Sequence, residues 1–584
     1  MPKIRHLASD RYYNYQELTE LLQDLAAAYP HLAKLHAIGQ SHRGRTIWLL
    51  EITNPDTGSA DQKPGYYIDA NTHAEEITGT TVVVHTAWTL LNGYGQDPPA
   101  TRLLDEQVFY LVPRLNPDGA EIILTMPFYE WIGNGRYLPG EEQFGPGLHY
   151  ADVNGDGFIL DMRIRDDAGE WKASQKDDRV MLPRDPDETG GEYYRMVPEG
   201  MLVDWDGGDF VIPRPQDGNL NRNYPSNWEP EVKQYGAGEF PVSEPEAAAV
   251  VRWILDHPNI AGIQSYHTHS GVILRPWLTL PDSEFLGHDK AIYEALGEMG
   301  VKETGYPLIS VFEDFTPDKK RRRYGSALEW TFGALGIISF STELWDVFKA
   351  AGVERKDFFP LRPYNNEEDQ IKLLQWQDEH LKGDGFMRWT PFQHPQLGPV
   401  EIGGWKRIFT FRNPPPGRYL EEEARANCQF TLRHAAAAPK LRLRDVAVAA
   451  EGEGVFHLQA VVDNVGFLPT NLSEQAVAMQ MAPSVAAELT GPEGMRFVQG
   501  QAHTDLGHLA GRSGRTRAYT RFYDWPLGNC TVQWTVKVPA GRPAALHLTV
   551  GCPRAGRAQA TVRIGADGRA TVEPQEAAGG RIGA

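Results

Sequence analysis

Short apolar runs that alternate with helix-length segments constrain the fold of this chain more than any other sequence feature. Residues 107–113 and 336–340 are almost continuously apolar, which is typical of strands covered on both faces. The segment Tyr15–Ala28 instead repeats leucine at helical spacing. Further strands are predicted at residues 48–52 and 65–70, and further helices at 77–92 and 367–381. This alternation predicts an α/β unit with a mostly parallel sheet and helices on both faces.

The length of 584 residues exceeds what one hydrophobic core supports, because single cores stop growing near ~250–300 residues. We expect a first domain at residues 1–410, interrupted by a Gly, Pro and Asp-rich insertion at about 138–217. A proline-rich stretch predicts a linker at 411–440. Short alternating strands then predict an antiparallel β-sandwich at 441–576, with a flexible tail at 577–584.

Charge and cysteine content limit the partners and the compartment. Acidic residues outnumber basic ones by 77 to 57, a net charge of −20 that argues against nucleic acid or an anionic membrane as partner. No apolar run approaches the ~18 residues of a membrane helix. The cysteines Cys428, Cys530 and Cys552 are too few for a disulfide scaffold and indicate a reducing compartment, although Cys530 and Cys552 could pair. We expect a cytoplasmic protein if Met1 is the native start, and a secreted or periplasmic one if a signal peptide was removed.

Metal-ligand residues follow several of the predicted strands. The sequence His73-x-x-Glu76 comes directly after one strand, a second apolar strand runs into His267 and His269, and a third ends at Glu343. Ligands of open α/β sheets bind beyond the carboxyl ends of strands, and imidazole with carboxylate suits Zn²⁺. A solvated or capped side chain explains each segment taken alone at least as well. Three such strand ends together predict one shared site, and a catalytic zinc needs three protein ligands and one open position.

A further motif, Asn221-Arg222-Asn223, supplies a guanidinium that can bind a substrate carboxylate through two hydrogen bonds. With this motif, the chain resembles the zinc carboxypeptidases of the carboxypeptidase A/B type over roughly residues 11–385. The matching motifs occur in the family's order: Ile38-Gly-Gln-Ser-His-Arg-Gly-Arg45, His73-x-x-Glu76, Asn116-Pro-Asp-Gly119, Asn221-Arg222-Asn223, Ser265-Tyr-His267, Leu274-Arg-Pro276 and Thr342-Glu343-Leu344.

The resemblance implies a mixed, mostly parallel sheet flanked by helices, and one zinc ion held by His73, Glu76 and His267. It also implies that Glu343 is the general base that activates the zinc-bound water and returns the proton to the leaving amine. Asn221 and Arg222 match the residues that bind the terminal carboxylate of the substrate. These roles agree with chemistry, because zinc lowers the pKa of bound water towards ~7 and a nearby carboxylate can shuttle the proton.

Two roles implied by the resemblance transfer less directly. The arginine that stabilises the oxyanion is assigned to Arg136, with Arg163 and Arg165 as competing positions because the insertion disturbs the alignment. The tyrosine that covers bound substrate is assigned to Tyr324, although the spacing to the following Glu-Trp pair points to Arg321.

The resemblance also indicates the side-chain preference. Leu328 matches the position that lines the side-chain pocket, which favours an aliphatic or aromatic C-terminal residue. Glu75 stands where the pancreatic-type enzymes have an arginine, which leaves room for a cationic or diamino substrate, including peptidoglycan peptides.

The insertion contains half of a calcium-loop pattern, with Asp152, Asn154 and Asp156 at alternate positions before a glycine. The twelfth position is Arg163, so a standard EF-hand is excluded. Two interpretations stay open: an irregular Ca²⁺ site that uses Asp161 or a distant carboxylate, or an Asx-turn loop that needs no ion.

These observations predict a zinc-dependent metallocarboxypeptidase that acts on peptides or proteins with a free C-terminal carboxylate. A zinc amidase, deacylase or peptidoglycan peptidase on the same scaffold is the first alternative. A catalytically silent binding protein that uses the β-sandwich is the second. The β-sandwich has no chemical motif, and the sequence predicts no oligomeric state.

Overall fold

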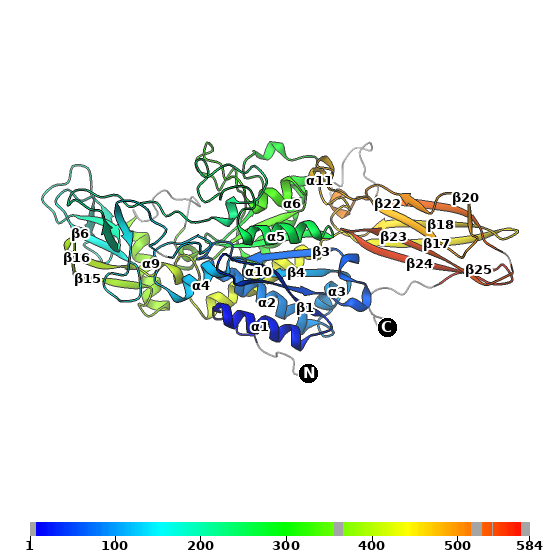
Figure 1. Ribbon diagram of the computed structural model, residues 1–584, viewed down its shortest axis with the longest axis horizontal. Helices are drawn as coiled ribbons and strands as arrows, with labels where there is room; N and C mark the ends of the chain where they lie inside the picture. The colour runs from blue at the N-terminus through cyan, green and yellow to red at the C-terminus, as the bar shows by residue number, and fades with distance from the viewer. Residues whose placement is uncertain (1–6, 139, 355–365, 516–527, 540, 574–584) are drawn as a thin grey trace.

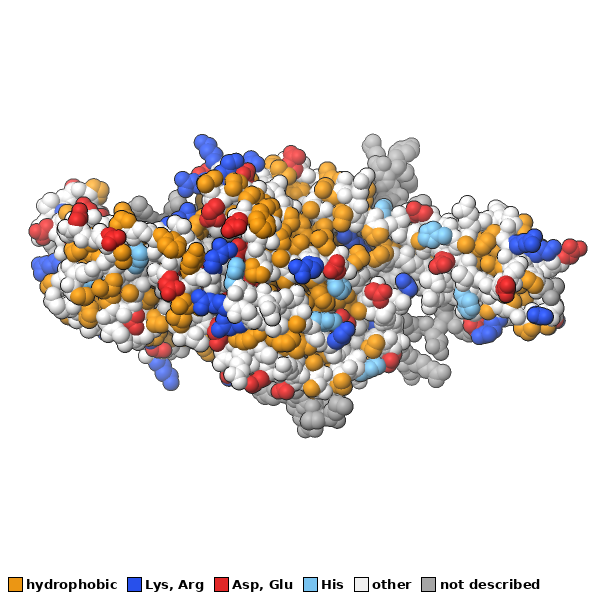
Figure 2. Space-filling view, in the orientation of Figure 1, with side chains coloured by type: hydrophobic (Ala, Val, Ile, Leu, Met, Phe, Trp, Pro, Cys, Tyr) orange, Lys and Arg blue, Asp and Glu red, His pale blue; other side chains and the backbone are white. Residues whose placement is uncertain are grey.

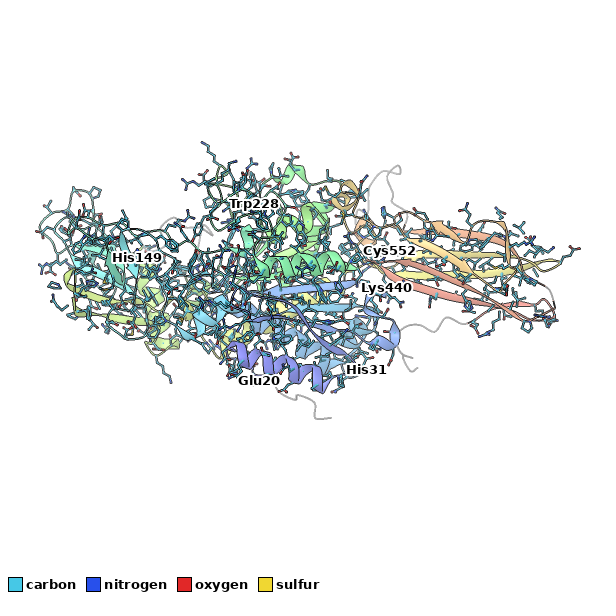
Figure 3. All side chains as sticks on the ribbon, viewed as in Figure 1. Glu20, His31, His149, Trp228, Lys440 and Cys552 are labelled. Atoms are coloured by element: carbon cyan, nitrogen blue, oxygen red, sulfur yellow. The ribbon has the colours of Figure 1, made fainter. Side chains whose placement is uncertain are left out.

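The computed structural model describes residues 7–138, 140–354, 366–515, 528–539 and 541–573. An α/β unit occupies the middle of an elongated molecule, and a β-rich region lies at each end (Figure 1). His149 lies in one of these end regions, Trp228 lies over the central unit, and Cys552 lies where the other β-rich region meets the central unit (Figure 3). Acidic and basic side chains are interspersed on the face that Figure 2 shows, rather than gathered into one field of a single sign.

The central sheet contains eight strands in the order β1-β2-β4-β3-β11-β14-β12-β13. Their bounds are β1 Ala33–Gln40, β2 Thr46–Ile52, β3 Gly65–Ala70, β4 Val108–Val112, β11 Ile260–Thr268, β12 Val272–Arg275, β13 Leu308–Ser310 and β14 Ser339–Leu344. Pairing is parallel between β4, β3, β11 and β14 in turn, and between β12 and β13, and it is antiparallel elsewhere. The expected α/β fold with a mixed, mostly parallel sheet is therefore confirmed.

Local sequence signals account for several of the elements around this sheet. The first helix is capped by Asn14, whose side chain accepts a hydrogen bond from the Glu17 backbone N–H, while the Glu17 side chain accepts one from the Asn14 N–H. Strands β3 and β11 are buried along their whole length, as expected for strands covered on both faces. The helices are α1 Tyr15–Ala28, α2 Thr78–Gly93, α3 Pro98–Glu106, α4 Pro117–Thr125, α5 Pro245–Asp256, α6 Asp289–Thr304, α7 Ala327–Gly333, α8 Val347–Ala350, α9 Glu367–His380, α10 Arg418–Ala435 and α11 Glu474–Ala478.

The insertion does not fold alone but shares a six-stranded sheet with a later segment of the chain, in the order β15-β16-β6-β9-β7-β8. These strands are β6 Asp161–Arg165, β7 Trp171–Ala173, β8 Met181–Pro183, β9 Tyr194–Pro198, β15 Phe386–His394 and β16 Gly398–Trp405. Beside it lies a two-stranded ribbon of β5 Gly147–Tyr150 and β10 Gly200–Val203. Apolar side chains from both parts, including Met162 and Ile402, form one small core. We call this region the inserted sheet.

The linker expected at 411–440 differs from the structure, which places helix α10 there. α10 packs on α2 and α6, and its residue Phe430 belongs to the main hydrophobic core. Tyr266 on the central sheet donates a hydrogen bond to the Asn427 carbonyl at 3.0 Å. The proline-rich stretch therefore precedes a core helix rather than a connector, because the helix buries an apolar face against the central unit.

The C-terminal strands form two antiparallel sheets around one core, which includes the fully buried Trp534. One sheet has the order β17-β18-β22-β20 and the other β21-β19-β23-β24-β25. Their strands are β17 Leu441–Gly452, β18 Val455–Asn464, β19 Ala486–Thr490, β20 Arg496–Gln499, β21 His503–Asp505, β22 Asn529–Lys537, β23 Ala544–Cys552, β24 Gly556–Ile564 and β25 Ala570–Val572. The expected β-sandwich agrees with this arrangement, and we call it the C-terminal sandwich.

The remaining expectations concern the cysteines, the C-terminal tail and membrane-spanning helices. Cys428, Cys530 and Cys552 are all unpaired, so the open Cys530–Cys552 pairing does not form. The expected tail at 577–584 lies outside the described residues. Within the described ranges, none of the helices combines the length and the hydropathy needed to cross a membrane.

Candidate active site

Three neighbouring parallel strands bring the expected metal ligands and the expected base to one edge of the central sheet. The loop after β3 contains His73 and Glu76, while β11 ends near His267 and β14 near Glu343. His267 lies directly beside Glu343 in the β11–β14 register. Because the carboxyl ends of adjacent parallel strands share one edge of a sheet, residues far apart in the sequence meet there.

The three expected ligands converge closely. His73 Nδ1 lies 2.9 Å from Glu76 Oε1, and His267 Nδ1 lies 2.9 Å from Glu76 Oε2. All three offer ligand atoms within 4.8 Å of one another. Burial alone would raise the pKa of Glu76, but the two histidines lower it below its ordinary value. Two imidazoles and one carboxylate are the donor set of a three-ligand zinc site, so the residues present fit that metal.

The Nε2 atoms of both histidines lie within hydrogen-bonding distance of polar side chains. His73 Nε2 lies 3.1 Å from Asn219 Oδ1. His267 Nε2 lies 3.5 Å from Ser265 Oγ, which donates a hydrogen bond to Asp69 at 2.5 Å. Such contacts fix the ring orientation and direct the inner nitrogens toward a metal. The sequence analysis did not identify Asn219 or Asp69. Asn219 could have been found because it lies two positions before the Asn-Arg motif, and Asp69 because it lies four positions before His73.

The Glu343 side chain is half-buried close to Glu76 and His267. Burial, and next the negative charge of Glu76, raise the pKa of the Glu343 carboxyl to about 8. A carboxylate with a pKa near neutral pH can both accept and return a proton during a reaction.

The Asn-Arg motif lies on a short 3₁₀ turn, Leu220–Arg222, close enough to Glu76 and Glu343 for their charges to act on Arg222. Burial, and next the like charge of Arg323, lower the pKa of Arg222 to about 9, while Glu76 and Glu343 oppose this shift. Arg222 Nη1 donates a hydrogen bond to the Asn221 carbonyl at 2.6 Å. The Asn221 side chain accepts one from the Ala327 N–H at 3.0 Å, so it fastens the start of α7.

The arginines considered for the oxyanion lie in two different regions. Arg136 Nη2 is 2.7 Å from Oε1 of the buried Glu244, and His42 Nε2 lies 2.8 Å from the other oxygen of Glu244, while Arg136 and His42 are themselves exposed. Arg163 and Arg165 both lie on β6 of the inserted sheet, paired with Glu401 and Glu192 at 2.7 and 2.8 Å. Arg136 is therefore the one of the three that lies in the central unit.

The segment before α7 holds the two positions considered for the covering tyrosine. Tyr324 is half-buried, and its backbone N–H donates to Gln234 Oε1 at 3.2 Å. The Arg321 side chain is almost fully exposed.

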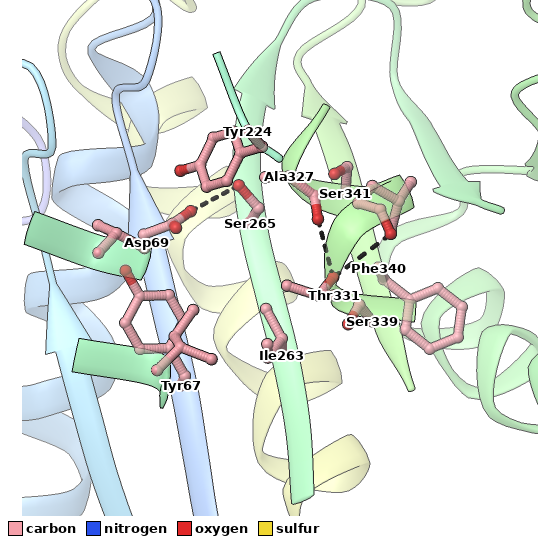
Figure 4. Close-up of a pocket in the computed structure, with 13 residues that line it drawn as sticks. Tyr67, Asp69, Tyr224, Ile263, Ser265, Ala327, Thr331, Ser339, Phe340 and Ser341 are labelled. Atoms are coloured by element: carbon pink, nitrogen blue, oxygen red, sulfur yellow. Dashed lines mark hydrogen bonds between the residues drawn. The ribbon is translucent and has the colours of Figure 1, made fainter. Parts of the chain in front are cut away.

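Leu328 lines a narrow pocket below this edge, together with Ala327 and Thr331 of α7 (Figure 4). Asp69 and Ser265 are among its polar lining residues, and the dashed line between these two in Figure 4 marks their hydrogen bond. Burial raises the pKa of the Asp69 carboxyl, and the hydrogen bond from Ser265 opposes this shift. The pocket thus combines apolar walls with one carboxyl group.

The expected calcium loop is closed by hydrogen bonds to its own backbone. Asp152 Oδ1 accepts from the Gly155 N–H, and Asp156 Oδ1 accepts from the Phe158 N–H. Asp161 lies on β6, where it accepts from the Tyr129 hydroxyl at 2.8 Å and contacts Arg407. A different carboxylate, that of the buried Glu199, accepts hydrogen bonds from the backbone N–H groups of Val153, Asn154 and Leu160.

Comparison with known proteins agrees with this geometry. The family model described as zinc carboxypeptidase matches residues 18–370, and a domain of unknown function (DUF8731) matches residues 440–563. Carboxypeptidase D of Homo sapiens is 38% identical over 115 residues, which are 20% of this chain and 8% of that protein. A zinc carboxypeptidase of Saccharothrix mutabilis subsp. capreolus is 30% identical over 125 residues, 21% of this chain and 28% of that protein.

Among solved structures, thrombin-activatable fibrinolysis inhibitor is 17% identical with a TM-score of 0.39, covering 64% of this chain and 73% of that chain. The alignments with carboxypeptidase D and with the Saccharothrix zinc carboxypeptidase span only 8% and 28% of the length of those two proteins. The family match, in contrast, covers more than half of this chain, and it includes His73, Glu76, His267 and Glu343. The protein belongs to the zinc carboxypeptidase family.

Proposed function

We propose that this protein is a zinc-dependent metallocarboxypeptidase that hydrolyses the C-terminal peptide bond of peptides or proteins. The observation that carries this proposal is the convergence of His73, Glu76 and His267 beside Glu343 on the neighbouring strand. Membership in the zinc carboxypeptidase family supports it.

His73, Glu76 and His267 would hold the zinc, which when bound polarises the scissile carbonyl and lowers the pKa of water. The Glu343 carboxylate accepts a proton from the attacking water as the water oxygen bonds to the carbonyl carbon. The C–N bond then breaks, and Glu343 returns the proton to the leaving amine nitrogen. Arg222 binds the terminal carboxylate of the substrate, which places the last peptide bond beside Glu343.

Glu343→Gln tests the proposal. In zinc-loaded protein this change should lower kcat by about 10²–10⁴-fold, because it removes proton transfer while keeping the shape of the side chain. Zinc content should stay at one per chain. The exposed Glu20→Gln on α1 is the control and should keep full activity. Full peptidase activity in Glu343→Gln would refute the mechanism.

The requirement for a free carboxylate is tested separately. Arg222→Met should abolish the preference for a peptide with a free C-terminal carboxylate over the same peptide amidated at its C-terminus. An enzyme that cleaves both peptides equally before the mutation would instead favour an amidase. A C-terminally randomised library, run with and without a zinc chelator, compares the apolar residues that Leu328 favours with cationic or diamino residues.

We also propose that a Ca²⁺ ion bound at the Asp152–Asn154–Asp156 loop would take a further carboxylate from either Asp161 or Glu199. Both carboxylates already have partners, since Glu199 accepts hydrogen bonds from three backbone N–H groups at the loop and Asp161 contacts Tyr129 and Arg407. Calorimetric titration of Ca²⁺ into Glu199→Gln and Asp161→Asn distinguishes the two carboxylates. Absence of Ca²⁺ binding in the parent protein would leave the Asx-turn loop as the correct interpretation.

A further inference from the structure

The zinc-ligand loop contains two adjacent buried carboxylates that contact different partners. Glu76 contacts the two histidines, as described above. Glu75 is 2% exposed, and its Oε2 accepts a hydrogen bond from the Trp131 N–H at 3.0 Å. Its other oxygen lies 3.2 Å from Nε of Arg412. A buried carboxylate needs a cation or several donors to offset lost hydration, and Arg412 supplies that cation.

Arg412 is held in this position by a second carboxylate. Its Nη2 lies 3.4 Å from Glu130 Oε1, and the same Glu130 oxygen lies 2.7 Å from Arg407 Nη1. Arg412 therefore stands between two carboxylates, one of which is next in sequence to an expected zinc ligand.

The neighbouring residue, Asn413, fastens the same loop from its other side. Its Nδ2 donates to the Glu75 carbonyl at 2.8 Å. Its Oδ1 accepts from the Thr78 N–H and from the Thr78 hydroxyl, at 3.1 and 2.7 Å. The loop 75–78 is thus held by two consecutive residues of one segment.

This segment joins the inserted sheet to α10 and lies outside the matched family region, residues 18–370. It also reaches the strand of the expected base, because Trp345 Nε1 donates to the Thr410 carbonyl at 2.7 Å. Trp345 follows Glu343 by two positions. One segment therefore contacts both the zinc-ligand loop and the end of β14.

We propose that Arg412 is a positioning residue of the zinc site, which acts through its ion pair with Glu75. The pair holds the loop so that Glu76 stays directed at His73 and His267. The site thus depends on a residue supplied by the segment after the inserted sheet. This inference rests on the proposed function, but metal binding tests it independently of any substrate.

The experiment compares Arg412→Met, Arg412→Lys, Glu75→Gln and the double variant Arg412→Met/Glu75→Gln. Zinc affinity is measured by competition with a chromogenic chelator, and kcat and KM are measured on one peptide. We expect Arg412→Met to weaken zinc binding about 10–100-fold and to lower kcat with little change in KM. Arg412→Lys keeps the charge but loses the guanidinium fork that joins Glu75 to Glu130, so it should recover only part of the zinc affinity that Arg412→Met loses.

The double variant tests whether Arg412 acts through Glu75. If it does, Arg412→Met should cost little more once Glu75 is already Gln, because the pair is then already broken. An Arg412→Met cost of the same size in both backgrounds would overturn the proposal, as would unchanged zinc affinity in Arg412→Met.

Arg179→Met is the matched control. Arg179 is also paired with two carboxylates, Asp177 and Asp378, at 2.7 and 2.8 Å, but it joins the inserted sheet to α9. Its loss should leave zinc affinity unchanged. A chain that binds zinc as expected but cleaves no peptide would refute the proposed function and leave the role of Arg412 standing.

Discussion

The two β-rich regions at the ends of the molecule meet the central unit in different ways (Figure 1). The inserted sheet continues directly into the segment whose Arg412 and Asn413 contact loop 75–78, which contains the expected ligand Glu76. The C-terminal sandwich instead contacts the C-terminal end of α7 and the residues that follow it. There Ser473 Oγ donates to the Gly336 carbonyl and Gln475 Nε2 to the Gly333 carbonyl, both at 2.6 Å.

The position of each contact indicates what each region can influence. Loop 75–78 contains an expected zinc ligand, so a change in the inserted sheet has a short route to the metal. The sandwich contacts the end of α7, whereas Leu328 at the start of that helix lines the pocket. Lys440, labelled in Figure 3, adds an ion pair to Glu106 at 2.6 Å, away from the metal-ligand edge. We therefore expect the inserted sheet to affect activity and the sandwich to affect stability.

The largest expected effect is on the sandwich. Trp534→Ala removes the largest side chain of its core, which should lower the free energy of unfolding of that region by about 3–5 kcal/mol. Scanning calorimetry should show one transition moving to lower temperature, while kcat/KM at 25 °C stays unchanged. A parallel loss of kcat/KM in folded protein would contradict the separation of the two roles.

Short-range patterns explain which parts of the site could be predicted from the sequence. His73, His267 and Glu343 could be predicted because each stands at or just beyond the end of an apolar strand, and the carboxyl ends of adjacent parallel strands share an edge. Asn413 could not, because 338 positions separate it from Glu75 and only the folded chain brings them together. The prolines around Asn413 also predicted a linker. That prediction missed helix α10 and the hydrogen bonds of Asn413 to Glu75 and Thr78, which we call the Asn413 clasp.

The strand predicted at 336–340 shows a similar limit. β14 spans Ser339–Leu344, three residues later than its apolar run suggests. Gly336 has φ of 64° and its N–H still bonds to the Phe332 carbonyl, so the start of the run closes α7 instead. An apolar run shows that a segment is buried, but it does not show where the strand begins.

The second expected effect concerns the hydrogen bonds of Asn413 to Glu75 and Thr78. Asn413→Ala leaves buried polar groups of Glu75 and Thr78 without partners, which should cost about 2–3 kcal/mol of stability. Zinc affinity should fall about tenfold, measured by chelator competition. Asn366→Ala removes the cap of α9, far along the chain, and should leave zinc affinity unchanged. Equal zinc affinity in both variants would show that the clasp does not reach the metal.

A third effect isolates the docking of the sandwich. Asp289 on α6 is buried and accepts hydrogen bonds from the Glu474 and Gln475 N–H groups at 2.8 and 3.0 Å. Asp289→Ala should lower the free energy of unfolding by about 1–2 kcal/mol, because two N–H groups at the start of α11 lose their acceptor. Urea unfolding measures this cost. A change in KM larger than about twofold would show that docking reaches the substrate pocket.

The smallest effect at neutral pH, and the most informative in acid, concerns α10, the helix that leads from the central unit to the sandwich. Burial lowers the pKa of His434 on this helix to about 3, and the Tyr66 hydroxyl oxygen lies 2.6 Å from His434 Nδ1. In the unfolded chain a histidine titrates near ~6.5, so acid protonates the unfolded state first. The stability that neutral His434 contributes is therefore complete above ~6.5 and is lost as the pH falls towards about 3.

His434→Gln removes this titration while keeping a polar side chain opposite Tyr66. At pH 7 the change in unfolding free energy should stay below about 1 kcal/mol, but the fall in stability between pH 6.5 and 4 should become shallower. Urea unfolding across this range measures both, with the surface change His31→Gln as the control. If the pH dependence of the unfolding free energy did not change, acid would unfold the two β-rich regions before it unfolds helix α10. A shallower slope would place the acid-sensitive step at α10, apart from both β-rich regions.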